Sequence, residues 1–456
     1  MESFDLIVLG AGPGGVAAAV RGAQLGASVA VVEPDKWGGL CLNRACIPTK
    51  YLTTAAERLA EFKAAPNHGL VPGGEASLDT AALWTQKREL SEYFSMGTQG
   101  LLTSRGIKLY PTRGRLDGPG KVALGSGEVL EAARAIIVCC GGAWQRPDLP
   151  GGDLPEVINS SQLLEGDGPP ARTLFLGGGP WQLELAQFCT AAGGEAWVVE
   201  KERNILPGWD SDIAQRLRSI INQPPLTILN QAEVVSLKKD GSGLEAVLLV
   251  KGEEMRLDVD KVVYVERRPA LEGLGLETVG LEDLSVDQGQ ATTVPGIYAV
   301  GDAAGGGWSH LATAQGIVAA ENALGGALSL NPRAVPKLCY TRPQAASVGL
   351  SEAQAEDLDY EVITGEAPLG MSPMAMILGQ SNGVVKVVGE ERYGELLGVH
   401  FLTPLATELV GQGVLAMQME ATLEELARAV LPHPTIAESL AEACREALGW
   451  AIFQPG

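Results

Sequence analysis

Two cysteines, Cys41 and Cys46, lie five positions apart in the segment Cys-Leu-Asn-Arg-Ala-Cys. Side chains about one turn apart share a helix face, so these thiols could form a disulfide if the segment is helical. A zinc half-site and two unrelated thiols are the alternatives. Zinc pairs usually have CxxC-type spacing and a second pair, which this sequence lacks, and structural disulfides are rare in the cytoplasm. The pair therefore favours redox catalysis.

A nucleotide-binding βαβ unit is expected immediately before these cysteines. Residues 5–9 form an apolar run that ends in Gly10-Ala11-Gly12-Pro13-Gly14-Gly15, and an alanine-rich helical stretch then leads to a strand at 28–32 and to Glu33. In this fingerprint Gly10 makes the tight turn, Gly12 lets the backbone approach a pyrophosphate, and Gly15 lets the helix sit close to the strand. The helix N-terminus favours phosphate, and Glu33 can accept ribose hydroxyls.

The same pattern returns at 173–200 in an imperfect form. A strand at 173–176 leads into Gly177-Gly178-Gly179, a helix follows at 183–192, and a strand at 196–199 ends at Glu200. The third small position of the turn is Gln182, which follows Trp181. The sequence thus predicts a second nucleotide-binding unit with an altered turn.

The rest of the chain indicates an α/β protein with a different C-terminal part. Residues 50–104 are expected to be helical, 107–138 to form short strands, and 296–300 to form a strand before Gly301 and Asp302. A helix is expected at about 311–324, and the prolines in 331–337 indicate a domain boundary. The elements expected beyond it are strands at 338–348, 384–389 and 396–402, helices at 404–418 and 422–430, and a terminal helix from 435.

Length and composition restrict the class of protein. The 456 residues are enough for about three domains, and 46% hydrophobic with 20% charged residues is ordinary for a globular protein. A net charge of -21 disfavours nucleic acid and anionic lipid as partners. With no apolar run long enough to span a membrane and no N-terminal leader, a cytoplasmic location is expected. The other five cysteines are expected to pack as small hydrophobic residues: Cys139, Cys140, Cys189, Cys339 and Cys444.

Four segments together resemble a known family. Residues 39–50, Gly-Leu-Cys-Leu-Asn-Arg-Ala-Cys-Ile-Pro-Thr-Lys, are similar to the active-site segment of the class I pyridine nucleotide-disulfide oxidoreductases, and most similar to that of the dihydrolipoamide dehydrogenases. Residues 301–303 resemble the family's second FAD motif, 340–350 the start of its dimerisation domain, and 433–438 its C-terminal catalytic segment. The resemblance covers almost the whole chain.

The resemblance implies a fold and an assembly. The fold class is α/β, with two Rossmann-like three-layer domains, for FAD and NAD, and a C-terminal α+β dimerisation domain. The expected boundaries are 1–150 with 271–334 for the FAD domain, 151–270 for the NAD-like domain, and 335–456 for the dimerisation domain. A homodimer is implied.

The resemblance also implies roles for the redox residues. Cys41 is the expected interchange thiol and Cys46 the expected charge-transfer thiol beside the flavin. His433, held by Glu438, is the expected acid and base that serves the interchange thiol, and it reaches the thiols of the other subunit. A thiolate is the nucleophile in such chemistry, and a neighbouring imidazole takes up its proton.

Further positions are expected to form an ion pair and to bind the cofactors. Lys50 and Glu184 match the family's ion pair near the flavin. The FAD contacts are expected from Gly10, Gly12, Gly14, Gly15, Glu33, Gly39, Gly141, Gly301, Asp302 and His310. NAD(H) is expected at Gly177, Gly179 and Glu200, with Glu200 favouring NAD over NADP. No metal site is expected.

Three positions depart from the family near the second nucleotide site. Gln182 stands where glycine or alanine is usual, Trp181 replaces a modest aliphatic residue, and Glu266 replaces the glycine of a Gly-Arg-x-Pro motif. Bulk and negative charge there would oppose a pyrophosphate. The expected function is electron transfer between a dithiol or lipoyl-domain substrate, the cysteine pair, FAD and NAD(H). The alternatives are an enzyme that uses a quinone or redox protein instead of NAD, and a non-catalytic flavoprotein subunit.

Overall fold

The computed structural model describes residues 2–454, and its first part is the expected nucleotide-binding unit. A seven-stranded sheet has the order β3-β2-β1-β6-β5-β4, with β17 paired to β6. Strands β1, β2, β3, β6 and β17 are parallel, and helices α1 and α8 pack against each other beside them. The elements are β1 (Glu2–Leu9), α1 (Pro13–Gln24), β2 (Val29–Val32), β3 (Lys108–Tyr110), β4 (Gly114–Leu116), β5 (Lys121–Leu124), β6 (Val129–Val138), β17 (Ile297–Ala299), η3 (Gly301–Ala304) and α8 (Ser309–Ala323).

The second part repeats this design around a five-stranded parallel sheet of order β11-β10-β9-β15-β8. An antiparallel sheet, β12-β13-β14, packs its apolar side chains with those of the parallel sheet. Short strands β7 and β16 pair where the chain passes between the two parts. The elements are β7 (Gly142–Trp144), β8 (Val157–Asn159), α5 (Ser160–Glu165), β9 (Arg172–Leu176), α6 (Pro180–Ala191), β10 (Glu195–Glu200), α7 (Ser211–Ile221), β11 (Leu226–Asn230), β12 (Ala232–Asp240), β13 (Gly243–Val250), β14 (Glu253–Val259), β15 (Lys261–Tyr264) and β16 (Arg267–Pro269). The next element, η2 (Leu276–Thr278), packs against the first part.

The C-terminal part is a five-stranded antiparallel sheet of order β18-β19-β22-β21-β20, with helices packed against it. Its terminal helix begins at Glu438, three residues later than expected. The elements are η4 (Pro332–Ala334), β18 (Lys337–Cys339), β19 (Gln344–Gly349), α9 (Glu352–Glu356), β20 (Val362–Pro368), η5 (Leu369–Met371), α10 (Pro373–Ile377), β21 (Val384–Glu390), β22 (Leu396–Thr403), α11 (Ala406–Gln418), α12 (Leu423–Ala427) and α13 (Glu438–Ala447).

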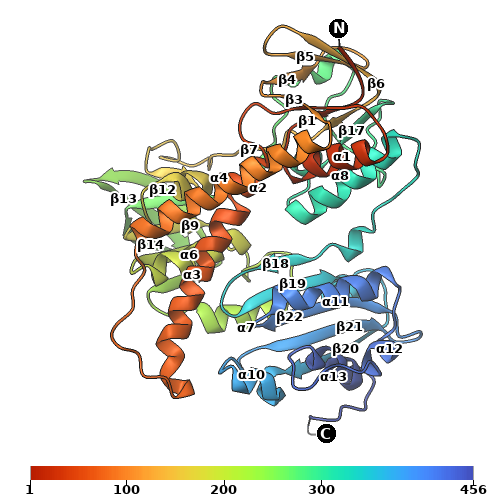
Figure 1. The fold of residues 1–456 in the computed structure, drawn as a ribbon. Coiled ribbons are helices and arrows are strands. Elements are labelled where there is room, and N and C mark those ends of the chain that lie inside the picture. Colours follow the sequence, from red (N-terminus) through yellow and green to blue (C-terminus); the bar gives the residue numbers. More distant parts are fainter. Residues whose placement is uncertain (1, 455–456) are drawn as a thin grey trace.

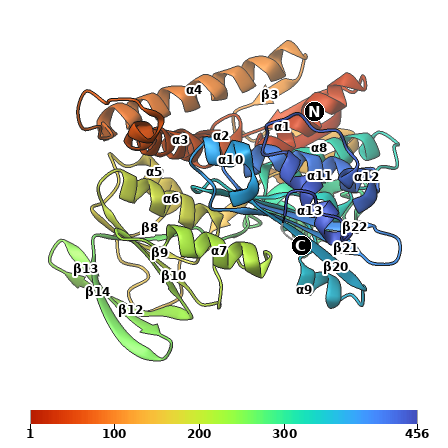
Figure 2. The same ribbon diagram turned by 90° about the horizontal axis from the view of Figure 1, so that it is seen from below.

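The three parts meet around the helices that carry the cysteines. Figure 1 shows the first sheet at the top, the second sheet to the left and the C-terminal sheet below, and Figure 2 gives the view from below. Together these sheets and helices confirm the expected α/β fold class. Among residues 2–454, no helix combines the length and the apolar character needed to cross a membrane.

The cysteine segment differs from the single helical stretch that the spacing suggested. Cys41 lies in the short helix α2 (Gly39–Arg44), and Cys46 is the first residue of α3 (Cys46–Ala64). Ala45 separates them with φ -142° and ψ -93°, which is not a helical conformation. The chain then continues through η1 (Ala65–His68) into the long helix α4 (Thr80–Ser104). The break places Cys46 at a helix N-terminus.

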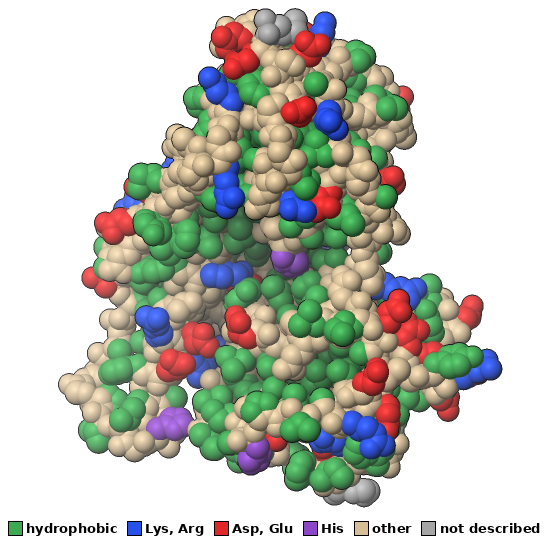
Figure 3. All heavy atoms as spheres, turned by 45° about the vertical axis from the view of Figure 1, so that its right-hand side comes forward, with side chains coloured by type: hydrophobic (Ala, Val, Ile, Leu, Met, Phe, Trp, Pro, Cys, Tyr) green, Lys and Arg blue, Asp and Glu red, His purple; other side chains and the backbone are tan. Residues whose placement is uncertain are grey.

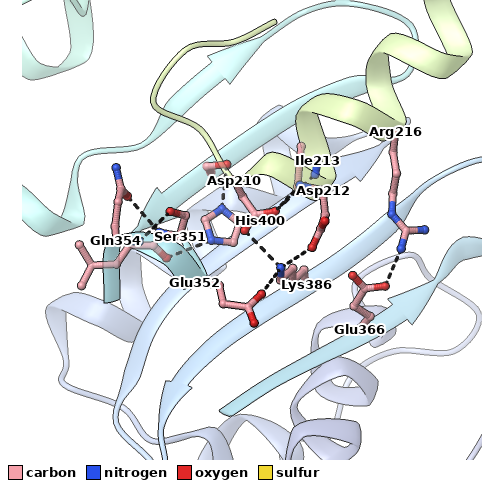
Figure 4. Close-up of polar contacts among 12 residues, drawn as sticks. Asp210, Asp212, Ile213, Arg216, Ser351, Glu352, Gln354, Glu366, Lys386 and His400 are labelled. Atoms are coloured by element: carbon pink, nitrogen blue, oxygen red, sulfur yellow. Dashed lines mark hydrogen bonds and ion pairs between the residues drawn. The ribbon is translucent and has the colours of Figure 1, made fainter. Parts of the chain in front are cut away.

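A buried lysine joins the second part to the C-terminal sheet (Figure 4). Lys386, on β21, is only 2% exposed. Its Nζ lies 2.6 Å from Asp212 Oδ2, 2.8 Å from Glu352 Oε2 and 3.3 Å from Asp210 Oδ2. Burial opposes its charge, but the carboxylates outweigh burial and raise the pKa of Lys386. Because Asp210 is the N-cap of α7, the lysine holds this helix against the C-terminal sheet.

Replacement of Lys386 by alanine is expected to destabilise the protein strongly. Removing one partner of a buried ion pair leaves uncompensated charge, at a cost of about 3–5 kcal/mol. Urea denaturation of Lys386→Ala measures the loss, and the exposed Lys238→Ala on β12 is the matched control. Equal stability of the two variants would contradict the structural role given to Lys386.

Candidate functional site: the dithiol and the nucleotide cavity

A cavity of about 730 Å³ opens at the carboxyl ends of β1 and β2. Its volume is in the range of small-molecule and cofactor pockets. Both cysteines of the redox pair line it. So do eight of the ten residues predicted to bind FAD: Gly10, Gly12, Gly14, Glu33, Gly39, Gly141, Gly301 and Asp302.

The glycine turn after β1 is open toward this cavity. A Cβ added to Gly12 would meet nothing within 4 Å, so the backbone there is free to face a ligand. A Cβ on Gly15 would lie 1.9 Å from the carbonyl oxygen of Gly10, which explains why that position holds glycine. Helix α1 begins here with Pro13 at its first position and no side-chain cap, so its N-terminal N–H groups are available to a phosphate.

Glu33 is buried at the end of β2 and organises the same turn. Its Oε2 accepts a hydrogen bond from the Ala11 N–H at 2.8 Å, and its Oε1 accepts one from the Asp35 N–H at 2.9 Å. Burial raises the pKa of Glu33 in spite of these two donors. The turn, the helix N-terminus and the carboxylate are the donor and acceptor set that a dinucleotide requires, so these residues fit FAD.

The two thiols lie side by side in the cavity wall. Both are free cysteines, and their side chains hydrogen-bond to each other. The hydrogen bond from Cys41 is the largest influence that lowers the pKa of Cys46, to about 7, while the same contact and burial raise the pKa of Cys41. Cys46 is also the first residue of α3 and lies one helical turn from Lys50, so its position favours the negative charge of the reduced pair, and the proton then stays on Cys41.

The predicted ion pair is present behind the thiols. Lys50 Nζ lies 2.5 Å from Glu184 Oε2, and the Glu184 side chain is 1% exposed. The other carboxylate oxygen of Glu184 accepts a hydrogen bond from the Tyr340 N–H at 2.9 Å, and Lys50 Nζ lies 4.4 Å from the centre of the Tyr340 ring. Burial alone would lower the pKa of Lys50, but Glu184 raises it, so the ammonium stays charged one helical turn from Cys46.

Asp302 lies on the cavity wall and pairs with Arg267, whose guanidinium bonds its carboxylate. The guanidinium is held between two aromatic rings, 5.6 Å from the centre of Trp144 and 5.0 Å from that of Trp181. Burial raises the pKa of Asp302 more than Arg267 lowers it. The sequence patterns predict no role for Arg267 or Trp144, although Arg267 follows Glu266 in the altered motif.

The second glycine turn closely repeats the first, apart from its third position. Glu200 is buried, and its Oε2 accepts a hydrogen bond from the Gly178 N–H at 2.6 Å, as Glu33 does from Ala11. Gln182 turns inward, and its Nε2 donates to the Leu176 carbonyl oxygen at 3.0 Å. Added Cβ atoms on Gly177 and Gly179 would lie 2.8 and 2.9 Å from the Gln182 amide, so this side chain fills the turn.

The three residues that depart from the family differ in their surroundings. Gln182 is buried in the second turn, whereas Trp181 lines the first cavity. Glu266 is exposed, and neither it nor Gln182 lines that cavity. The expected repulsion by Glu266 is therefore weakened by solvent, and only the glutamine bears directly on the second turn.

His433 and Glu438 form the expected pair at a separate place. His433 Nδ1 lies 3.0 Å from Glu438 Oε1, and the Thr435 N–H donates to Glu438 Oε2 at 2.9 Å. Burial raises the pKa of Glu438, but these two partners outweigh it and the net shift is downward. The pair lines a hollow of the C-terminal part, together with residues such as Met371 and Val430, and not the cavity of the thiols.

Two residues near the cavity differ from expectation. His310 is not among the cavity-lining residues, because its Nε2 contacts the Pro336 carbonyl oxygen at 2.8 Å and its ring stacks on Trp308. Its neighbour Ser309, which the sequence reasoning missed, lines the cavity and contacts Cys46. The only sequence signal for Ser309 was its place at the start of a helix that follows the second FAD motif.

Comparisons with known proteins agree with this geometry. Residues 4–323 match the family described as pyridine nucleotide-disulphide oxidoreductase, and residues 335–444 match its dimerisation domain. The dihydrolipoyl dehydrogenase of Thermus scotoductus is 38% identical over 453 residues, covering 97% of each chain. That of Haloferax volcanii is 34% identical, covering 98% of this chain and 97% of the relative.

Solved structures share the fold. LpdA from Mycobacterium tuberculosis superposes with a TM-score of 0.86 at 24% identity, covering 98% of this chain and 99% of that chain. The HOCl-induced flavoprotein disulfide reductase RclA from Escherichia coli, in its Cu(II) complex, gives a TM-score of 0.85 at 23% identity over 97% of this chain and 99% of that chain. The family matches and the full-length relatives show that the chain belongs to the pyridine nucleotide-disulphide oxidoreductases and is an FAD-dependent disulfide oxidoreductase.

Proposed function

We propose that the protein is a dihydrolipoyl dehydrogenase, in which Cys41 and Cys46 accept an electron pair from a dithiol such as a lipoyl group. The observation that carries this proposal is the cysteine pair itself. Its two side chains are in contact, they line the dinucleotide cavity, and the charged Lys50 lies one turn behind Cys46. Relatives named dihydrolipoyl dehydrogenase that match along the whole chain support the choice of substrate class.

The thiol chemistry begins from the Cys41–Cys46 disulfide. A substrate thiolate attacks Cys41 Sγ, a mixed disulfide forms, and the bond to Cys46 breaks with the negative charge on Cys46. The second thiolate of the same substrate then attacks the substrate sulfur of the mixed disulfide and releases Cys41. The substrate leaves as a disulfide, and the two cysteines hold the two electrons.

The charges in the cavity wall favour cleavage of the disulfide with the negative charge on Cys46. Cys46 is the first residue of α3, where helix N–H groups favour an anion, and Lys50 stabilises the same charge. Bound FAD would supply the two-electron acceptor between the thiols and NAD+. Gly12, Glu33 and Asp302 are the residues proposed to hold this cofactor.

His433 is proposed to act across a dimer interface. In a single chain the His433 ring is 67% exposed and lies in a different hollow from Cys41. The matched dimerisation domain supports a homodimer, and Figure 3 shows hydrophobic side chains gathered on the lower half of the molecule, where this domain lies. His433 of the partner subunit would then remove the proton from Cys41, with Glu438 fixing its tautomer.

The wild-type protein is expected to oxidise dihydrolipoamide with NAD+, and Cys46→Ser to abolish this turnover. Serine cannot form the disulfide that accepts the electron pair. The assay follows NADH formation at equal FAD content, and Cys444→Ala, at a buried cysteine of the C-terminal core, is the control. Normal turnover by Cys46→Ser would refute the proposal.

Mixed dimers test the position of His433. Cys41→Ser and His433→Gln homodimers are each expected to be inactive. After the two variants are unfolded and refolded together, about one quarter of wild-type turnover should return, because about half of the dimers are mixed and each has one intact site. No recovery, with mixed dimers demonstrated by mass spectrometry, would place His433 in the site of its own chain or outside catalysis.

A second candidate function is favoured by Gln182. An enzyme of this class with a weakened NAD site would deliver electrons to a quinone or a redox protein. The glutamine amide occupies the turn that should approach the pyrophosphate, where the first site keeps Gly15. Glu200 nevertheless holds the turn in the same way as Glu33, which supports NAD as the ligand.

The effect of the glutamine is expected in the KM for NAD+. Gln182→Gly should lower this KM about tenfold with little change in kcat, since it would remove a group that opposes binding in ground and transition states alike. Steady-state kinetics with dihydrolipoamide measure both constants, and Thr190→Ala, near the other end of α6, is the control. An unchanged KM would show that Gln182 does not hinder NAD+.

The remaining expectations form part of the proposal. We place the protein in the cytoplasm, where free thiols such as the five other cysteines persist. We also propose the domain division at 1–150 with 271–334, 151–270 and 335–456, which is supported by the three largest sheets, each of which lies within one division. A purely structural flavoprotein subunit is disfavoured, because such a role needs neither the paired thiols nor the His433–Glu438 pair.

A further inference from the structure

The hydroxyl of Ser309 lies 3.1 Å from Cys46 Sγ, although the two residues are 263 positions apart. Ser309 is the first residue of α8, as Cys46 is of α3, and neither helix has a side-chain cap. Two helix N-termini thus meet at one sulfur. Both residues also line the dinucleotide cavity.

Within residues 2–454 the Ser309 hydroxyl interacts only with the two thiols: it lies 3.1 Å from Cys46 Sγ, and it also lowers the pKa of Cys41. The Thr313 hydroxyl bonds the backbone carbonyl of Ser309 and not its side chain. A sulfur at 3.1 Å is well within hydrogen-bond reach of a hydroxyl. Once Cys46 has lost its proton, only the serine can donate in this contact.

We infer that Ser309 donates a hydrogen bond to the Cys46 thiolate and thereby stabilises the reduced form of the Cys41–Cys46 pair over its disulfide. This inference rests on the redox role proposed for the pair. Reduction adds two electrons and one proton to the disulfide, breaks the S–S bond, and leaves a thiol at Cys41 and a thiolate at Cys46. The hydrogen bond is strongest to that thiolate, because the acceptor then carries a full charge.

Other contacts also favour the reduced pair with its negative charge on Cys46. Cys41 donates to Cys46, Lys50 attracts its charge, and Ser309 adds a third favourable contact against the cost of burial. Together they lower the pKa of Cys46 to about 7. A residue that stabilises the thiolate also raises the reduction potential of the pair, as in dithiols whose reduced form is favoured.

Ser309→Ala is expected to raise the pKa of Cys46 by about one unit, the size of one hydrogen bond to a charged group. The holoenzyme is measured in a Cys41→Ser background, where Cys46 is the only thiol of the pair. Its long-wavelength thiolate-to-flavin absorption is titrated with pH. Ser309→Thr, which keeps the hydroxyl, should retain the parental midpoint, and Thr313→Ala, one turn along α8, is the control.

The reduction potential gives a second readout with Cys41 restored. A tenfold loss of thiolate stability corresponds to a potential about 30 mV more negative for a two-electron couple. This difference should be present at about pH 9 and vanish at about pH 6, where Cys46 is protonated in both proteins. Equilibration with dithiothreitol buffers, followed by alkylation and mass analysis, measures it.

The outcomes separate the inference from the proposed function. An unchanged midpoint and potential in Ser309→Ala, at full FAD content, would overturn the role of Ser309 and leave the function intact. If the Cys41→Ser parent lacks the absorption band at every pH, the role given to Cys46 is wrong. Alkylation of Cys46 as a function of pH then still decides whether Ser309 stabilises its thiolate.

Discussion

The ion pair between Lys50 and the buried Glu184 is the contact on which the redox site depends. Lys50 belongs to the helix that begins at Cys46, Glu184 to the helix after the second glycine turn, and Tyr340, which bonds Glu184, to the C-terminal part. A carboxylate that is 1% exposed is costly unless it is paired, so these three segments must meet for either charge to be tolerated. Their meeting also holds an ammonium behind the thiol that must carry a negative charge.

In the reduced dithiol, the negative charge and the proton lie on different cysteines. Ser309 and Lys50 favour a thiolate on either cysteine, but Cys46 is the first residue of α3 and lies 3.1 Å from the Ser309 hydroxyl, which favours the charge on Cys46. Cys41 then keeps its proton and needs an external base. The structure therefore assigns different tasks to two chemically identical side chains through their surroundings alone. In the proposed mechanism, this asymmetry makes Cys46 the leaving thiolate when a substrate attacks Cys41. It also accounts for the external base, a role that the proposed function gives to His433 of the partner subunit.

The two nucleotide turns show how one local design tolerates different residues. In both, a buried glutamate at the end of the second strand accepts a hydrogen bond from the turn backbone. In the first turn a Cβ at Gly15 would collide with the backbone, whereas in the second Gln182 fits by bonding the Leu176 carbonyl. The substitution is therefore compatible with folding, and its proposed effect is on the binding of NAD+. Lys386 gives the second part a comparable anchor to the C-terminal sheet, through the carboxylates of Asp210 and Asp212.

The sequence by itself determined the α/β class, the two glycine turns with Glu33 and Glu200, and the paired cysteines, because these features depend on short-range spacing and periodicity. Even the Lys50–Glu184 pair followed from a family resemblance. The break at Ala45, the inward turn of Gln182, the aromatic enclosure of Arg267 and the contact of Ser309 with Cys46 were decided only by the tertiary structure. Each depends on how a side chain is oriented or on which distant helices pack together. Local sequence patterns specify a helix, but they do not specify which sulfur its first residue will touch.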